Sequence, residues 1–404
     1  MTTNSTSADT ERIIWEHGGG GEKTHKLRKE FAYTLSNPFL NVLDEAASFV
    51  IDQNELGIVP FTTKKDERLR LALTTDTYVI SPPRFEHEDI GKLAVYSTVN
   101  DLAMVGARPL CLSAGFVLEV GFPRPRLLEI VQSMANATRS LEICIITGDT
   151  KVVDHIVVKG KEENAYGTNE GRKVLSLSED KPFEMLINTT GLGIIHEKWQ
   201  GVTRAQDGDC LVLSGTLGDH DAALMVARKE GNPKSCVQYS GDQPAVESDK
   251  DRFYLYPLVE TLIDNIGDDI RCLKNLTRGG IAMAAHEIAL HSNVGIVLQV
   301  GAENEMLDEE DKKAPFVSPE ARRAFGDLPD VDYTALASEG RMLIVVSPKK
   351  ARQAVKFLQQ HPLGRGAQIV GTIKASHPRQ VYLRKGGEGS RELRMPSAAL
   401  PHSC

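Results

Sequence analysis

Short β-rich runs alternate with runs of helical period over most of the chain, and this alternation constrains the fold more than any other feature. Residues 69–80 and 142–153 have the composition of strands, whereas residues 123–141 have the periodicity of a helix. Residues 89–118 combine an apolar helix, a turn at residues 106–109 and a strand. The pattern predicts layers of helices and sheets, an α+β fold with α/β layers.

A polar, glycine-bearing segment, residues 155–184, divides this pattern into two halves. Because 404 residues exceed what one ordinary core holds, we expect two domains, each with its own apolar interior. We predict an N-terminal domain over residues 1–183, with the polar insertion at 155–183. A C-terminal domain over residues 184–376 and a tail over residues 377–404 follow.

The charge and hydropathy of the chain exclude several classes of partner. A net charge of -8 and a pI near 5.8 disfavour binding to nucleic acid or to an anionic membrane. Apolar runs stay short of the roughly 18 residues that span a bilayer, and the polar start is unlike a signal peptide. We therefore expect a cytoplasmic protein that acts on a small molecule.

The chain ends on a cysteine, Cys404, which is one of six scattered cysteines without a CxxC pair. A prenylation signal needs its cysteine four residues from the end, so this ending does not match that signal and we do not expect a lipid anchor. Cys111 and Cys144 lie in apolar runs and are expected to be buried. The terminal thiol is therefore the candidate reactive group.

Acidic residues recur at the expected ends of strands. Carboxylates gathered at one rim of a sheet are the ligands that Mg²⁺ needs when it carries the phosphates of a nucleotide. Any one of these residues alone is more often a turn residue or a helix cap. As a group they favour a magnesium site, and they are Asp44, Glu45, Asp76, Asp101 and Asp149.

Two glycine loops complement these acids, because their backbone N–H groups can approach an anion closely. The second loop opens a helix, whose N-terminus favours phosphate. Neither loop fits the P-loop or the Rossmann spacing, and a glycine run alone is usually a flexible loop. The loops consist of His17, Gly18, Gly19, Gly20 and Gly21, and of Thr277, Arg278, Gly279 and Gly280.

Lys151 and Glu287 are the candidate proton-transfer residues. Lys151 follows Gly148-Asp149-Thr150 and could neutralise phosphate charge, although a solvated lysine is the simpler interpretation. Glu287 lies on an alanine-rich helix, where partial desolvation would suit a general base, or it is a surface residue. His220 and His286 fit capping or packing roles.

Read together, these segments resemble the HypE family of hydrogenase maturation proteins, within the PurM-like group of ATP-using enzymes. The resemblance rests on "HGGGG", "LDEAA", "TTDTYVI", "TGDTKVV", "INTTGLG", "SGTLGDH", "TRGGIAMAAHEIA" and the closing "LPHSC". It covers almost the whole chain and fails mainly near residues 155–184 and 301–325.

The resemblance implies a PurM-like two-domain fold in which the N-terminal sheets of two subunits pair in a homodimer. It implies that a HypF-type carbamoyltransferase loads the terminal cysteine. The enzyme would then use ATP to dehydrate this S-carbamoyl group to S-cyano, for a HypC/HypD-type acceptor. ATP and Mg²⁺ are the implied cofactors.

The resemblance also implies a role for each matching residue. Cys404 would carry the substrate, and Lys151 and Glu287 would handle protons beside it. The glycine loop from His17 to Gly21 would cover the phosphates. Asp44, Asp76, Asp101 and Asp149 would hold Mg²⁺ with ATP, with Asn100 and Thr150 beside them.

The chain departs from the family pattern at three places. Asn275-Leu276 stands where Asp-Pro is usual, which removes one carboxylate from the second domain. Glu45 replaces an aspartate, and His402-Ser403 replaces Arg-Ile before the last cysteine. These changes bear on the metal stoichiometry and on the choice of partner.

Two other function classes compete with this interpretation. One is a PurM-like ATP-dependent synthase that activates an amide of a free small molecule, which predicts that Cys404→Ala leaves turnover intact. The other is a scaffold that binds a nucleotide without catalysis, which predicts no ATP hydrolysis with a carbamoyl-loaded tail.

Overall fold

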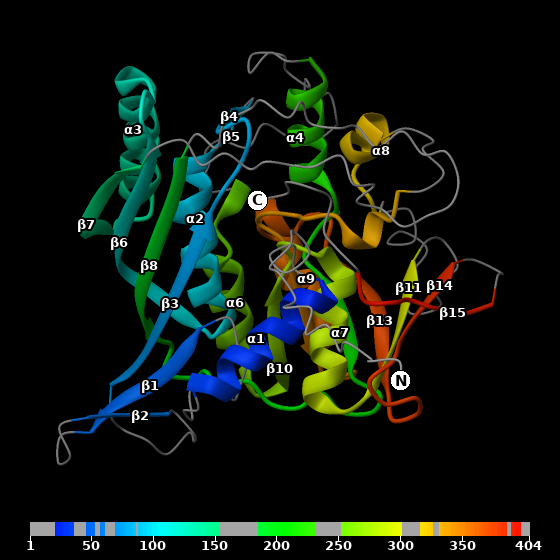
Figure 1. Ribbon diagram of the computed structural model, residues 1–404. Helices are drawn as coiled ribbons and strands as arrows, with labels where there is room; N and C mark the ends of the chain where they lie inside the picture. Colours follow the sequence, from blue (N-terminus) through cyan, green and yellow to red (C-terminus); the bar gives the residue numbers. More distant parts are fainter. Residues whose placement is uncertain are drawn as a thin grey trace, which may run out of the picture.

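The structure is a computed structural model that describes residues 21–35, 46–52, 57–60, 69–85, 88–153, 185–230, 252–300, 316–325, 331–385 and 389–396. Its strands form two large sheets and one two-stranded ribbon, β4 (Arg84–Phe85) with β5 (Glu88–Asp89). Helices pack against both large sheets, as Figure 1 shows. The predicted mixture of helical and sheet layers is therefore confirmed.

The first sheet has the strand order β2-β1-β3-β8-β6-β7. One face carries buried side chains beneath helix α2 (Ile90–Met104), and the opposite face carries exposed or half-buried ones. Along β8, for example, Ile187 and Thr189 are buried and Asn188 is half-buried, as the two-residue period of a strand requires. The strands are β1 (Ala47–Asp52), β2 (Gly57–Pro60), β3 (Arg70–Tyr78), β6 (Ala107–Glu119), β7 (Cys144–Val153) and β8 (Met185–Ile195).

Two helices flank this sheet. The side chain of Asp89 caps α2 by accepting a 2.9 Å hydrogen bond from the backbone N–H of Lys92. Helix α3 (Arg124–Ser140) packs along α2 and presents Ile130 and Met134 to it. The predicted helices and strands between residues 89 and 153 are therefore confirmed.

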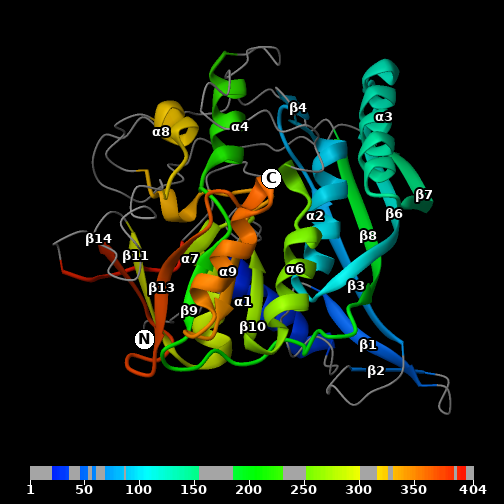
Figure 2. The same cartoon turned by 180° about the vertical axis from the view of Figure 1, so that it is seen from behind.

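The second sheet has the order β10-β12-β9-β13-β11-β14-β15. Helices α6 (Tyr256–Ile266) and α9 (Ala351–Gln359) cover one face, and α7 (Gly280–Ser292) covers the other (Figure 2). The strands are β9 (Cys210–Leu213), β10 (Ile270–Asn275), β11 (Gly295–Val300), β12 (Met342–Val346), β13 (Gln368–Lys374), β14 (Val381–Lys385) and β15 (Arg391–Glu392).

Shorter elements complete the described part of the chain. Helix α4 (Asp219–Glu230) packs against α8 (Pro319–Phe325), and α1 (Glu22–Leu35) precedes β1. Three 3₁₀ turns, Gly267–Asp269, Tyr333–Ala335 and Pro362–Gly364, connect larger elements. Each described helix is too short or too polar to cross a bilayer.

The two sheets do not follow the predicted domain limits. Strand β8 pairs between β3 and β6, so the first sheet extends through Ile195, beyond residue 183. Strands β14 and β15 belong to the second sheet, although they lie in the predicted tail. Which strands pair depends on contacts between residues that are far apart in the sequence. A local sequence pattern carries no information about these contacts.

The expectation that Cys111 and Cys144 are buried is wrong. Cys144 is exposed, and Cys111 is only half-buried. The two residues are register partners on β7 and β6. Strand β7 lies at the edge of the sheet, and the side chain of Cys144 points to the open face. An apolar run does not distinguish an edge strand from a central one.

Candidate active site

Asp76 lies near the end of β3 with its side chain toward α2. The hydroxyl of Ser97 donates a 2.7 Å hydrogen bond to Oδ2, and the backbone N–H of Thr77 donates to Oδ1 at 2.8 Å. Ser97 and Asp101 are four residues apart on α2 and therefore share one face of the helix. Helix α2 thus aligns two of the predicted carboxylates along this face.

Asp101 meets the second sheet through Asn275, the last residue of β10. Nδ2 of Asn275 lies 3.4 Å from Oδ1 of Asp101, whereas Oδ1 of Asn275 is buried and has no hydrogen-bond partner among the described residues. A buried acceptor without a partner costs about 1–3 kcal/mol, so a ligand at this point relieves that cost. An amide oxygen beside a carboxylate suits a hard cation such as Mg²⁺.

Asp149, Thr150 and Lys151 lie elsewhere, on the exposed edge strand β7. Nζ of Lys151 is 2.6 Å from Oδ2 of Asp149, and both side chains are more than two-thirds exposed. The hydrogen bond from Lys151, with that from the N–H of Thr150, lowers the pKa of Asp149. Within one chain this pair faces solvent.

Asp76, Asp101 and Asp149, the three predicted metal ligands that the structure describes, therefore do not meet at one rim of a sheet. Asp101 lies within a helix, and the register runs from Thr77 across β8 and β6 to Asp149. Three strand spacings place Asp149 about 14 Å from β3, and on the face opposite to Asp76. No three His, Cys, Asp or Glu side chains form a metal cluster within the described ranges. Asp44 lies outside those ranges.

Asn100 is fully buried and is engaged in contacts within the protein. Its Nδ2 donates to the carbonyl of Phe253 at 2.8 Å, and its Oδ1 accepts from the N–H of Leu255 at 2.9 Å. These bonds fix the segment before α6 against α2. The structure thus gives Asn100 a positioning role, and nucleotide binding by it stays a prediction.

Glu287 forms an ion pair on the α7 side of the second sheet. Its Oε2 lies 3.3 Å from Nζ of Lys274, and both side chains are mostly buried. Lys274 and Asn275 are consecutive on β10 and therefore point to opposite faces. Glu287 and Lys151 lie in different halves of the molecule (Figure 1), so one chain does not bring the predicted proton-transfer pair together.

The loop of residues 277–280 leads into α7, as predicted. Gly279 and Gly280 have φ values of +81° and +55°. A Cβ on Gly280 would lie 2.5 Å from the carbonyl oxygen of Leu336, so only glycine fits beside that segment. Thr277 and Arg278 precede this turn and are half-buried.

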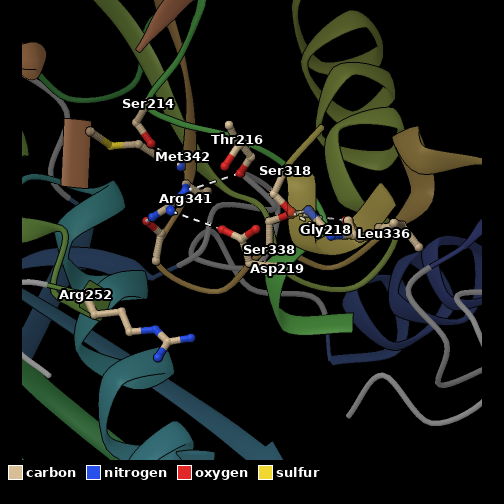
Figure 3. Close-up of polar contacts among 12 residues, drawn as sticks. Ser214, Thr216, Gly218, Asp219, Arg252, Ser318, Leu336, Ser338, Arg341 and Met342 are labelled. Carbon is tan, nitrogen blue, oxygen red and sulfur yellow. Dashed lines mark hydrogen bonds and ion pairs between the residues drawn. The ribbon is translucent and has the colours of Figure 1, made fainter. Parts of the chain in front are cut away.

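Residues 214–219, which belong to the family-like segment "SGTLGDH" but were given no site role, lie around Arg341 (Figure 3). The guanidinium lies 3.3 Å from the carbonyl oxygen of Thr216 and 3.3 Å from Oδ2 of Asp219. Oγ1 of Thr216 and Oδ1 of Asp219 are buried without a partner within the described residues. These oxygens are available to a ligand that donates hydrogen bonds. The sequence feature that could have pointed to this site is Arg341, a charged residue directly before the apolar strand β12.

A second unpredicted cluster joins the two halves of the chain. Nδ1 of His220 lies 2.9 Å from Oε2 of Glu88, and both side chains are 2% exposed. Burial lowers the pKa of His220, but the Glu88 carboxylate outweighs it and raises this pKa to about 9. Arg252 lies 3.5 Å from Glu88, and the hydroxyl of Tyr78 donates to Glu339 at 2.7 Å. His220 is therefore a packing residue, but an ion-paired one.

Glu22, which directly follows the first glycine loop, lies next to Pro396, the last described residue of the chain. Gly21 is buried, and the backbone N–H of Glu22 donates a 3.1 Å hydrogen bond to the carbonyl of Pro396. Cys404 and the loop residues His17, Gly18, Gly19 and Gly20 lie outside the described residues.

The sequence matches two families that together span most of the chain. Residues 55–164 match the N-terminal domain of AIR synthase related proteins, and residues 206–384 match the C-terminal domain. The chain is 32% identical to carbamoyl dehydratase HypE of Azotobacter vinelandii over 96% of both chains. It is 35% identical to carbamoyl dehydratase HypE of Escherichia coli strain K12 over 88% of this chain and 89% of that one.

Solved structures are similar over nearly the full length. A chain of a HypE-HypF complex superposes with a TM-score of 0.67 at 30% identity, covering 92% of this chain and 99% of that one. HypE in complex with ATP gives a TM-score of 0.63 at 30% identity, covering 97% of this chain and 100% of that one. A ThiL chain complexed with AMPPCP and TMP, at 16% identity and a TM-score of 0.57, shares the fold alone.

Proposed function

Because this chain belongs to the carbamoyl dehydratase HypE family of enzymes, we propose that it dehydrates an S-carbamoyl group on its own Cys404 to an S-cyano group. ATP is consumed: R–S–CO–NH₂ and ATP give R–S–CN, ADP, phosphate and a proton. The cyano group then serves hydrogenase maturation, the process that the names of its relatives denote. We place the reaction in the cytoplasm.

The chemistry explains why a nucleotide is needed. An amide oxygen is a poor leaving group, and transfer of the γ-phosphoryl group to it forms a C–O–P linkage that can break. A base must remove the N–H protons so that the carbon–nitrogen triple bond forms as phosphate departs. Glu287 is our candidate base, and the ammonium of Lys274 at 3.3 Å favours its carboxylate form.

We propose that the nucleotide's metal binds at the junction of the two halves. Asp76 and Asp101 lie along one face of α2, and Oδ1 of Asn275 points into the same region without a partner. We propose that these residues hold Mg²⁺, which when bound neutralises phosphate charge. Asp44, Asn100, Thr150 and the loops 17–21 and 277–280 remain proposed contributors to nucleotide binding.

The observation that carries the proposal is the hydrogen bond between Glu22 and Pro396. It places Glu22, which directly follows the glycine loop proposed to cover the phosphates, next to Pro396, the last described residue before Cys404. The eight residues that follow Pro396 can span at most roughly 26–29 Å. This span is consistent with delivery of the sulfur to a site near that loop.

We also propose a homodimer that forms through the open face of the first sheet. Leu73 on this face is 43% exposed, and Ile146 on the edge strand is 68% exposed. Asp149 and Lys151 lie on the same face, so pairing of two sheets would cover them. Lys151 would then act near the partner's substrate, which resolves its distance from Glu287.

HypE-type relatives indicate the protein partners. A solved HypE-HypF complex motivates a HypF-type carbamoyltransferase as the donor to Cys404. A HypC/HypD-type acceptor would remove the cyano group. The ending His402-Ser403 is where such partners would read this chain.

Intact-mass spectrometry tests the reaction. Cys404 is first carbamoylated with a HypF-type partner and carbamoyl phosphate, and Mg·ATP is then added. We expect the mass to fall by one water, and Cys404→Ser should show neither the gain nor the loss. An unchanged mass with nucleotide bound contradicts the dehydratase proposal, and turnover of a free amide by Cys404→Ala would favour the small-molecule synthase.

A further inference from the structure

The last described segment of the chain is held at its start by the second core. Strand β15 pairs with β14, and the N–H of Leu393 donates to the carbonyl of Val381 at 2.8 Å. The side chain of Leu393 is 4% exposed and belongs to the same apolar cluster as Ile288 of α7. Of the described residues after β15, Leu393 alone is buried.

His286 binds this same point from α7. Its Nε2 lies 2.8 Å from the carbonyl oxygen of Leu393, and the residue is buried. A carbonyl only accepts, so this ring nitrogen carries the proton. Burial also lowers the pKa of His286, so the ring stays neutral near pH 7. His286 directly precedes Glu287, the proposed base.

We infer that His286 is a positioning residue that fixes the start of the cysteine-bearing tail to α7 and thereby limits the reach of Cys404. This inference rests on the proposed function. Eight residues follow Pro396, which contacts Glu22, and they span at most roughly 29 Å. Pro396 is only three residues from Leu393, so release at Leu393 also weakens the contact with Glu22. Loss of both contacts would leave the 12 residues after Glu392, which span at most about 43 Å.

A longer tail would let the sulfur of Cys404 explore a larger volume, so the effective concentration of this sulfur at the proposed active site would fall. Loss of the His286 bond should therefore slow dehydration of a loaded tail without changing ATP affinity. Carbamoylation by the partner, which needs an accessible thiol, should not slow. A variant that only destabilised the protein would slow both carbamoylation and dehydration, whereas loss of a positioning contact should slow dehydration alone.

Three variants test the inference. His286→Phe removes the donor and keeps a ring, His286→Gln keeps an N–H at a similar distance, and His291→Phe is the matched control on the same helix. Trypsin cuts after the exposed Arg394, and mass spectrometry measures release of residues 395–404. We expect His286→Phe to release this peptide roughly five- to tenfold faster, with His286→Gln and His291→Phe close to wild type.

Single-turnover dehydration of the pre-carbamoylated protein provides the second measurement. We expect slower dehydration in His286→Phe and recovery in His286→Gln. Wild-type rates of both peptide release and dehydration in His286→Phe would overturn the inference. If wild type itself loses no water, the proposed function fails, while the proteolysis result still decides whether His286 holds the tail.

Discussion

At the scale of single residues, Asn275 is the position where this chain's own chemistry departs most clearly from the expected acid. It places a buried, unpartnered amide oxygen next to the carboxylate of Asp101. A neutral oxygen binds a divalent cation more weakly than a carboxylate does. The site should therefore bind metal with lower affinity than an all-carboxylate one.

Asn275→Asp should raise the affinity for Mn²⁺ about tenfold, because a second negative charge faces Asp101. Without metal the same change should lower the melting temperature, since two carboxylates then repel each other. Calorimetric titration with Mn²⁺ and thermal unfolding with and without metal measure both effects. Asn265→Asp on α6 is the control, and equal Mn²⁺ affinity in the two variants would contradict the assignment.

The Glu88 and His220 pair makes a prediction about pH. The pKa of His220 is raised from its ordinary value of 6.5 to about 9, so its stabilising effect is complete below pH 6.5 and is lost as pH rises towards 9. Arg252, Glu339 and Asp221 surround the pair, and burial raises the pKa of Glu339 above its ordinary value. Burial also raises the pKa of Asp221, to about 6, which affects only the acid side of this window.

Between pH 6.5 and 9 the free energy of unfolding of wild type should fall by an amount on the order of 2–3 kcal/mol. Glu88→Gln should be less stable at pH 6.5 and should vary little over the same range. Urea unfolding at several pH values measures this. A parallel decline in both proteins would show that the pair is not responsible.

At the scale of elements, local sequence patterns were sufficient to predict strands and helices that bury one face. Strand β3 and helices α2, α3 and α7 lie where the sequence places them, since apolar period and turn residues agree there. Helices α1 and α6 and strands β10, β11 and β14 were not predicted. The sequence Glu22–Leu35 mixes charged and aromatic residues, so the sequence analysis did not single it out as a helix.

The candidate site was only partly predictable for a related reason. Asp76 and Asp101 were both predicted at the ends of strands, but Asp101 lies within α2, and a strand pattern does not say which face a residue occupies. Asp149 therefore seemed equivalent to Asp76, although a register one residue apart sends them to opposite faces. Arg341 meets Thr216, and Glu88 meets His220, through segments far apart in sequence, which no local spacing reveals.

The turn before α7 makes a prediction at this scale. Gly280→Ala should destabilise the protein by about 2–4 kcal/mol, because its Cβ would lie against the backbone of residues 334–336. Gly121→Ala is the matched control, since Gly121 also has a positive φ of +91° but open space around it. That variant should lose only about 1–2 kcal/mol. Chemical unfolding compares them, and equal losses would reject the steric argument.

At the scale of the whole molecule, one apolar cluster runs through both halves. It includes Leu93 and Val99 of α2 together with Met342 and Ile344 of the second sheet. Such a shared core fixes the two sheets relative to each other. It therefore fixes Asp101 against Asn275, the contact on which the proposed metal site depends.

The open face of the first sheet makes the prediction for assembly. Leu73→Glu should convert the proposed homodimer into a monomer, because a charge would be buried between the two sheets. Leu128→Glu, on the outer side of α3 and 50% exposed, should remain dimeric. Sedimentation velocity distinguishes the species, and a dimeric Leu73→Glu would place the interface elsewhere.

The bond between Glu22 and Pro396 also has a practical consequence. Glu22 opens α1 and Pro396 is the last described residue, so the bond ties the first turn of α1 to the segment that precedes the sulfur. A substitution that unwinds this turn would loosen that segment without touching any of the proposed ligands. An engineered change near residue 22 should therefore be counted among changes to the reaction, although it lies far from the sulfur in sequence.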